Sequence, residues 1–211
     1  MEVWAAVEEN PLASWILRHL RDAGTGVAAF REWSRKAGIM LAVQVARELE
    51  WRSVRVKTPL DAYAEELEPV EQPLLVAVLG AALPLLDGFL EIYREAPVGL
   101  VAARRRENGE ITVEVYYERL PAKPPRTTVI IDPMLATGKT IEAIARLVKE
   151  RGSTRTVVAS IIASKPGLSY LATTGLVDAV YTLTVDEQLD HRYFIVPGLG
   201  DAGDRGLGVT P

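Results

Sequence analysis

The chain has 211 residues, of which 48% are hydrophobic and 25% charged, and its formal net charge is −4 at pH 7. These values are typical of one globular α/β domain and exclude extensive disorder. There is no cysteine, which excludes disulfides and thiolate metal sites. Because the N-terminus has no basic segment and the apolar runs are interrupted by Gly, Pro and Asp, we expect a cytoplasmic protein that neither spans a membrane nor binds nucleic acid.

The first part of the chain, residues 1–50, predicts helices. Asn10 and Pro11 form a favourable N-cap and first-turn pair, and apolar residues then recur at helical spacing as far as Gly24. Thr25 can cap a second, longer helix with an apolar stripe.

The next part predicts a buried strand and a hairpin arm. A strand at residues 53–60 and a turn-rich acidic segment from Asp61 to Gln72 come first. The apolar run at residues 74–80, followed by a helical pattern, is typical of a central parallel strand and its crossover helix. Two β-rich runs flank Asn108-Gly109 and predict a two-stranded arm over residues 97–120.

Strands and helices alternate again over residues 127–186, and a Gly-rich tail covers residues 187–211. The pattern predicts a single α/β domain over residues 1–211. Its core would be an open, mainly parallel sheet flanked by helices, with the N-terminal helices and the hairpin arm added to it.

One loop predicts a phosphate site. It ends in Gly138-Lys139-Thr140, as a nucleotide-binding P-loop does, but Pro133 stands where a P-loop requires Gly, which argues against a kinase or NTPase. What remains is a buried strand that ends in the Asp132 carboxylate and a short loop that leads into a helix. Amides at a helix N-terminus suit a phosphate, and a carboxylate suits ribose hydroxyls. The pattern favours a ribose 5-phosphate site; an ordinary turn capped by Thr137 or Thr140 is the alternative.

Two motifs resemble those of the uracil phosphoribosyltransferases. Asp-Pro-Met-Leu-Ala-Thr-Gly-Lys-Thr, residues 132–140, is similar to the family's phosphoribosyl-diphosphate loop, and Phe-Ile-Val-Pro-Gly-Leu-Gly-Asp-Ala-Gly-Asp-Arg, residues 194–205, to its uracil-binding tail. The resemblance implies a type I phosphoribosyltransferase fold and the reaction of uracil with 5-phosphoribosyl 1-diphosphate (PRPP) to give UMP and diphosphate. It extends over essentially the whole chain, through residues 20–25, 57–60, 87–88 and 116–121.

The resemblance also implies roles for residues. The catalytic residues would be Asp132, Arg104 and Asp201. The contacts to PRPP would come from Asp132, Pro133, Met134, Leu135, Ala136, Thr137, Gly138, Lys139, Thr140, Arg104 and Asp201. Uracil would contact Ile195, Gly200, Asp201 and Ala202. Mg²⁺ would bind the diphosphate through substrate oxygens and water, and no protein metal ligands are predicted.

Arg104 is the first residue of an arginine triplet beside the predicted hairpin turn. The alignment favours Arg104 as the residue that reaches the diphosphate, but the hairpin register leaves Arg105 and Arg106 open. A solvated triplet at the end of an arm is the alternative.

Two residues depart from the family pattern. Gly80 stands where the family has an arginine that contacts the diphosphate, and Lys139 stands where the phosphate loop has a small residue. Lys139 either supplies a compensating cation or crowds the loop. The alternative to a working enzyme is therefore a non-catalytic relative that binds uracil, UMP or another nucleotide as a sensor or regulatory subunit.

Partners are expected from the family as well. Relatives are usually homo-oligomers, and apolar surface on the N-terminal helices favours a homodimer or a larger assembly. GTP or a pyrimidine nucleotide is an expected effector, for which Arg35-Lys36 is either a contact or ordinary surface charge. His19 and His191 have no second metal ligand nearby in the sequence and are expected to be structural.

Overall fold

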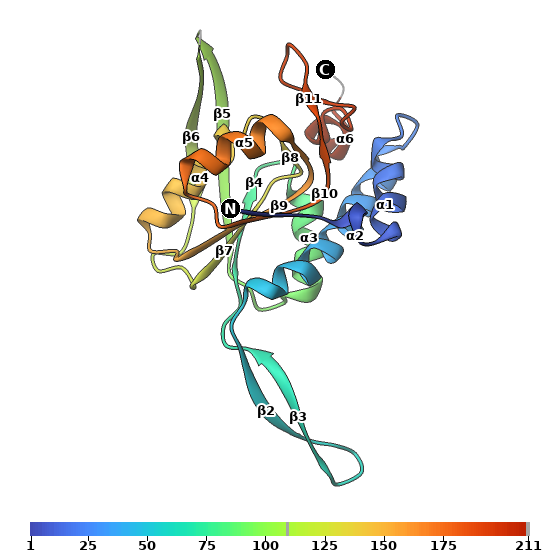
Figure 1. Ribbon diagram of the computed structural model, residues 1–211, viewed down its shortest axis with the longest axis vertical. Helices are drawn as coiled ribbons and strands as arrows, with labels where there is room; N and C mark the ends of the chain where they lie inside the picture. The colour runs from blue at the N-terminus through green and yellow to red at the C-terminus, as the bar shows by residue number, and fades with distance from the viewer. Residues whose placement is uncertain (109, 210–211) are drawn as a thin grey trace.

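The computed structural model describes residues 1–108 and 110–209. For residues 105–108, 110 and 111 it describes the backbone but not the side chains. One mainly parallel sheet forms the centre of the molecule (Figure 1). Its strands are β1 (Glu2–Ala5), β4 (Leu74–Val78), β5 (Val98–Asn108), β6 (Glu110–Arg119), β7 (Thr127–Ile131), β8 (Met134–Leu135), β9 (Arg155–Ser164) and β10 (Ala179–Asp186).

The order β1-β10-β9-β7-β4-β5-β6, with β8 beside β9, confirms the predicted open sheet. Neighbouring strands run parallel except for β5 and β6, which form the predicted hairpin arm. Gly109 of the predicted hairpin turn lies outside the described residues. The strand at β1 was not predicted; it adds to the sheet through parallel pairing with β10.

Helices cover both faces of the sheet. They are α1 (Pro11–Arg21), α2 (Val27–Val45), α3 (Leu83–Ile92), α4 (Lys139–Glu150), α5 (Lys165–Thr174) and α6 (Ala202–Leu207), with 3₁₀ turns η1 (Ala6–Glu8) and η2 (Ala46–Glu48). Leu75 and Val129 point to one face and pack with α1, α2 and α3, whereas Leu74 and Ile130 point to the other and pack with α4 and α5. Burial on both faces explains the continuous apolar run of β4. In the described part of the chain, no helix is both long and apolar enough to cross a membrane.

The N-terminal helices follow the prediction except at one cap. Asn10 Oδ1 accepts a hydrogen bond from Leu12 N at 2.9 Å, which confirms the predicted start of α1. The predicted cap at Thr25 is wrong, because α2 begins at Val27 with Gly26 as its N-cap. Thr25 Oγ1 instead donates to the carbonyl of His19 at 2.6 Å, so its hydroxyl serves the end of α1.

The prediction of a turn-rich acidic segment from Asp61 to Gln72 is wrong. Residues of this segment form β3 (Tyr63–Pro69), which pairs antiparallel with β2 (Trp51–Lys57). The two strands form a long hairpin that extends away from the sheet (Figure 1). The acidic residues of β3 face basic and polar partners: Arg52 Nε donates to Glu68 Oε1 at 2.8 Å, and Ser53 Oγ donates to Glu65 Oε2 at 2.9 Å. Cross-strand pairing of this kind stabilises a strand despite the low β-propensity of Glu.

Helices α2 and α3 cross with their backbones in contact. A Cβ atom on Gly88 would lie 2.1 Å from the carbonyl oxygen of Arg35, and one on Gly38 would lie 2.2 Å from the carbonyl oxygen of Leu85. Both positions therefore require glycine for reasons of space. This crossing fixes α3, and with it the loop between β4 and α3.

Gly88→Ala is expected to lower the free energy of unfolding by about 1–3 kcal/mol, because the added methyl group forces the two helices apart. Gly26→Ala is the control, since a Cβ atom there meets no atom within 4 Å, and its expected cost is below about 1 kcal/mol. The measurement is denaturant unfolding of both variants. Equal losses would contradict the close crossing.

Candidate functional site

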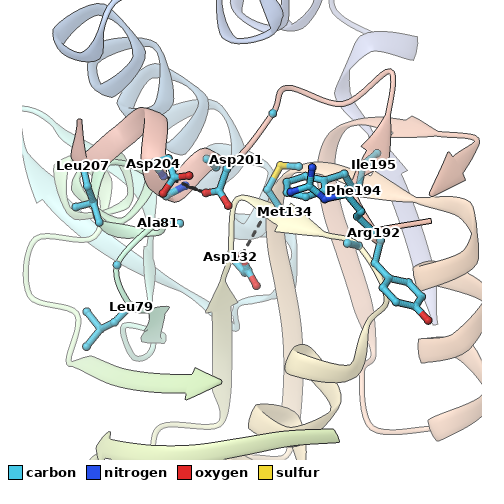
Figure 2. A pocket seen from close by; sticks show the side chains of 16 residues that line it. Leu79, Ala81, Asp132, Met134, Arg192, Phe194, Ile195, Asp201, Asp204 and Leu207 are labelled. Carbon is cyan, nitrogen blue, oxygen red and sulfur yellow. Dashed lines mark hydrogen bonds between the residues drawn. The ribbon is translucent and has the colours of Figure 1, made fainter. Parts of the chain in front are cut away.

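A cavity of about 370 Å³ opens where β4 and β7 end (Figure 2). Three segments meet there: the loop after β4, the loop after β7 and the C-terminal tail. The lining residues are Leu79, Gly80, Ala81, Asp132, Met134, Ala136, Arg192, Tyr193, Phe194, Ile195, Gly200, Asp201, Ala202, Gly203, Asp204 and Leu207. In an open parallel sheet, ligands bind in this position, outside the carboxyl ends of the strands.

The loop after β7 is held to β9 from its first residues. The amide of Asp132 donates to the carbonyl of Ala159 at 3.1 Å, and the carbonyl of Pro133 accepts from the amides of Ile161 and Ile162, both at 3.1 Å. The side chain of Asp132 accepts a hydrogen bond from the amide of Met134 at 3.2 Å. The carboxylate therefore has a fixed place at the cavity floor.

The second half of this loop packs tightly against α5. Ser164 Oγ donates to the carbonyl of Ala136 at 2.5 Å. Gly138 has a φ of 79°, and a Cβ atom on it would lie 2.9 Å from the carbonyl oxygen of Gly167. Gly138 is also the N-cap of α4, so the expected cap at Thr137 or Thr140 is wrong; the left-handed backbone and the close approach both require glycine here.

Lys139 points toward α5. Its Nζ lies 5.2 Å from the ring centroid of Tyr170, and Lys139 is not among the described residues that line the cavity. The hydroxyl of Tyr170 donates to Glu142 Oε2 at 2.5 Å. This hydrogen bond is the main cause that lowers the pKa of Glu142, with Arg146 and Lys139 contributing their positive charge. Lys139 thus belongs to a cluster on the α5 side of the loop.

The tail reaches the cavity through β11 (Gln188–Leu189), β12 (Ile195–Val196) and the start of α6. Asp201 is the N-cap of α6, since its Oδ1 accepts from the amides of Gly203 at 2.8 Å and Asp204 at 3.0 Å. Figure 2 shows Asp201 and Asp204 on the tail, across the cavity from Asp132.

Half of the predicted site residues, seven of fourteen, line the cavity. Those that line the cavity are Asp132, Met134, Ala136, Ile195, Gly200, Asp201 and Ala202. Pro133 and Leu135 belong to the same segment but are buried, and they are not among the described lining residues. Thr137, Gly138, Lys139 and Thr140 lie at the start of α4, beyond the described lining.

Arg104 is not at the cavity in this structure. It lies exposed on β5, with its Cζ atom 6.0 Å from the ring centroid of Tyr116. The side chains of Arg105 and Arg106 are outside the described residues. The structure therefore does not bring Arg104 to the other predicted residues.

Sequence reasoning missed Arg192 and Tyr193. Arg192 is the one Lys or Arg among the described residues that line the cavity; its Cζ atom lies 5.1 Å from the ring centroid of Phe194. The only sequence signal for it is its position just before the tail motif. Leu79 and Ala81, which also line the cavity, were not predicted. In this loop only Gly80 was singled out, because it departs from the family pattern.

The cavity carries more negative than positive charge. Asp132, Asp201 and Asp204 provide carboxylates, which suit a hard cation such as Mg²⁺. Among the described residues, however, no group of three or more His, Asp or Glu side chains is arranged to hold a metal ion. His19, which was expected to be structural, is not among the described lining residues; it stacks on Trp33, with ring centroids 4.1 Å apart.

The chain is similar to proteins of one family along nearly its full length. It matches the family model described as uracil phosphoribosyltransferase over residues 7–208. It is 50% identical over 204 residues to the uracil phosphoribosyltransferase of Aeropyrum pernix, which covers 96% of this chain and 95% of the relative. Identity to the uracil phosphoribosyltransferase of Pyrobaculum arsenaticum is 39%, over 93% of this chain and 95% of that protein.

Solved structures agree on the fold. The AQ2163 protein from Aquifex aeolicus superposes with a TM-score of 0.88 at 27% identity, over 99% of both chains. The purine phosphoribosyltransferase from Pyrococcus horikoshii superposes with a TM-score of 0.51 at 16% identity, over 74% of this chain and 84% of that one. At that identity the likeness concerns the fold alone.

Gly138→Ala is expected to weaken the binding of ribose 5-phosphate by about tenfold or more, because the strained backbone and the clash with α5 displace the loop amides. Gly175→Ala is a matched control, since Gly175 has a φ of 66° but a Cβ atom there meets nothing within 4 Å. Calorimetric titration of ribose 5-phosphate compares the two. Equal affinities would contradict a phosphate site at this loop.

Proposed function

This chain belongs to the uracil phosphoribosyltransferase family, and we propose that in the cytoplasm it transfers the phosphoribosyl group of PRPP to uracil, giving UMP and diphosphate for pyrimidine salvage. The observation that carries the proposal is the single cavity in which Asp132, from the phosphate loop, faces Gly200 and Asp201, from the tail. A sugar site and a base site must adjoin for this reaction.

The reaction requires positioning rather than a covalent intermediate. A bond forms between uracil N1 and C1′ of the ribose, the C1′–O bond to diphosphate breaks, diphosphate leaves with the electron pair, and the N1 proton is released. The transition state resembles a sugar cation next to a leaving anion, so fixed charges and dipoles stabilise it.

The residues divide this task by segment. The Asp132 carboxylate would accept hydrogen bonds from the ribose hydroxyls. The amides at residues 136–140, at the start of α4, would bind the 5-phosphate with help from the helix dipole. The backbone at Ile195 and Gly200, with Asp201 and Ala202 alongside, would read the alternating carbonyl and N–H groups of uracil. A base with a reversed pattern would leave these backbone groups unpaired, at about 1–3 kcal/mol each.

Mg²⁺ fits the proposed site as a partner of the substrate. When bound to the diphosphate, it would neutralise the charge of the leaving group. Asp132 and Asp201, two of the carboxylates that line the cavity, would hold it from the protein side, and the remaining ligands would be diphosphate oxygens and water, since Mg²⁺ keeps several waters when it binds.

The cation that replaces the missing arginine at position 80 is not Lys139 in this proposal, because its ammonium lies on the α5 side of the loop, 5.2 Å from the ring centroid of Tyr170. Arg192 lines the cavity and would contact a substrate phosphate directly. Arg104 would join it when the β5–β6 arm closes over the bound substrate.

Purified protein with uracil, PRPP and Mg²⁺ is expected to form UMP, and chelation of Mg²⁺ is expected to stop the reaction.

Asp132→Ala should lower kcat/KM by about 100-fold or more, because the ribose hydroxyls lose their hydrogen-bond acceptor. Arg192→Ala should lower kcat/KM by about tenfold, and Lys139→Ala, its matched control, by less than about threefold. UMP formation and steady-state kinetics of the variants are the measurements.

The regulatory alternative predicts a different set of results. It is supported if the native chain binds UMP without turnover and gains activity in Gly80→Arg. The backbone at position 80 has room for a Cβ atom, which would meet only Leu207, at 3.4 Å and beyond.

We also propose that the protein is a homodimer or larger, with the β2–β3 arm packed on a second copy. An isolated two-stranded hairpin is marginally stable in water, yet this arm exposes Leu60, Tyr63 and Leu67. The apolar surface predicted on the N-terminal helices is present too, as a groove lined by Leu12, Trp15, Ile39, Met40 and Val43.

We propose GTP or a pyrimidine nucleotide as an effector only because of the resemblance to the family. Arg35 forms an ion pair with Glu91. Lys36 pairs with Glu32 at 2.8 Å and lies 4.0 Å from the ring centroid of Trp33. These contacts support the interpretation of Arg35 and Lys36 as ordinary surface charge.

Leu67→Glu is expected to convert the oligomer to monomers of about 23.1 kDa, because it places a charge in the apolar interface of the arm. Tyr116→Glu is the control: Tyr116 on β6 is 65% exposed, as Leu67 on β3 is 66% exposed. Light scattering after size-exclusion chromatography gives the masses. A native chain of monomer mass would contradict the proposed assembly.

A further inference from the structure

The end of α1 contacts the C-terminal tail through a partly buried ion pair. Arg21 donates to both carboxylate oxygens of Asp186, from Nη2 to Oδ1 at 2.6 Å and from Nη1 to Oδ2 at 2.9 Å. Asp186 is the last residue of β10 and is only 5% exposed. Bidentate pairs of this kind have a well-defined geometry, so they hold two elements at a fixed separation.

The same ion pair engages the backbone of Gly198 on both sides. Arg21 Nη1 donates to the carbonyl of Gly198 at 2.6 Å, and the amide of Gly198 donates to Asp186 Oδ2 at 2.9 Å. Gly198 has a φ of 59°, and a Cβ atom on it would lie 2.0 Å from the carbonyl oxygen of Ile195. The turn at Gly198 is therefore tight, and its two polar backbone groups are both bound to the ion pair.

A second guanidinium holds the next residue of the tail. Arg205, on α6, donates from Nη1 to the carbonyl of Leu199 at 2.6 Å and from Nη2 to the carbonyl of Asp22 at 2.7 Å. Its Nη1 also donates to the carbonyl of Leu20, and its Cζ atom lies 4.4 Å from the ring centroid of Phe30. Burial lowers the pKa of Arg205, in keeping with a guanidinium that binds carbonyls rather than water.

These contacts explain a segment that the site itself does not use. Residues 20–25 match the family pattern, yet among the described residues that line the cavity there is none from this segment. Figure 1 shows α6 and the tail next to the end of the N-terminal helices, where the segment lies. Arg21 and Arg205 are not among the described residues that line the cavity. They donate to the carbonyls of Gly198 and Leu199, the two residues that precede Gly200.

We propose that Arg21, Asp186 and Arg205 form a clamp that fixes the backbone at residues 198–200 and thereby positions Gly200 to recognise uracil. The inference rests on the proposed function, in which the backbone of Gly200 reads the base. The clamp residues are positioning residues, since they touch the loop and not the substrate. Backbone donors and acceptors must be held to about 0.5 Å for specific recognition, and a Gly-rich loop cannot hold itself so closely.

The test uses Arg21→Lys and Asp186→Asn in the full chain. Arg21→Lys keeps the charge but loses the forked geometry. Each variant is expected to raise KM for uracil by about tenfold while KM for PRPP stays within about twofold. In the ligand-free protein, hydrogen exchange of the amides at residues 198–200 should become faster by about tenfold or more.

Glu187→Gln is the matched control. Glu187 follows Asp186 in the sequence and pairs with Lys165 at 2.7 Å, but its side chain is 66% exposed. This variant should change neither KM nor the exchange of residues 198–200, because an exposed ion pair contributes little.

Parallel increases of both KM values, or unchanged exchange at residues 198–200, would overturn the proposal. If the native chain gives no turnover, the proposed function fails, while the exchange experiment still decides whether the clamp holds the loop. Circular dichroism shows which variants fold. If neither Arg21→Lys nor Asp186→Asn folds, Arg205→Lys is measured in the same way. Hydrogen exchange at residues 198–200 as slow as in the native chain would then also overturn the proposal.

Discussion

The parallel pairing of β4 with β7 is the constraint on which the rest of the site depends. The register places Leu74 beside Thr128 and Ala77 beside Ile131, so the two strands end at the same level. The loop that contains Gly80 and the loop that begins at Asp132 therefore open into one cavity. Burial of both strands on both faces holds this pairing, and the helix crossing at Gly88 and the packing of α5 on Gly138 hold the loops.

Much of the fold and of the site could be predicted because local pattern and global structure agree there. The apolar runs of β4 and β7 and the loop into α4 are read directly from residue type and order. The strand β3 could not be predicted, since its Glu residues disfavour a strand until Arg52 and Ser53 face them across the hairpin. Arg192 could not be predicted either, because only the folded tail turns an exposed loop residue into the cavity wall.

The two departures from the family pattern have different structural consequences. Lys139 does not crowd the phosphate loop, since its side chain lies over Tyr170 and near Glu142. Gly80 leaves the cavity without an arginine from the β4 loop, and in the proposed function Mg²⁺, Arg192 and Arg104 supply the charge for the diphosphate. The N-terminal helices add a further constraint, because Arg21 ties them to the tail at Gly198.

The central claim is that one cavity holds a ribose phosphate and a pyrimidine base at the same time. A crystal structure with UMP tests it most directly. We expect the 5-phosphate at the amides of residues 136–140, the ribose hydroxyls at Asp132 and the base against the backbone of Gly200. UMP bound elsewhere, or bound with its base away from the tail, would contradict it.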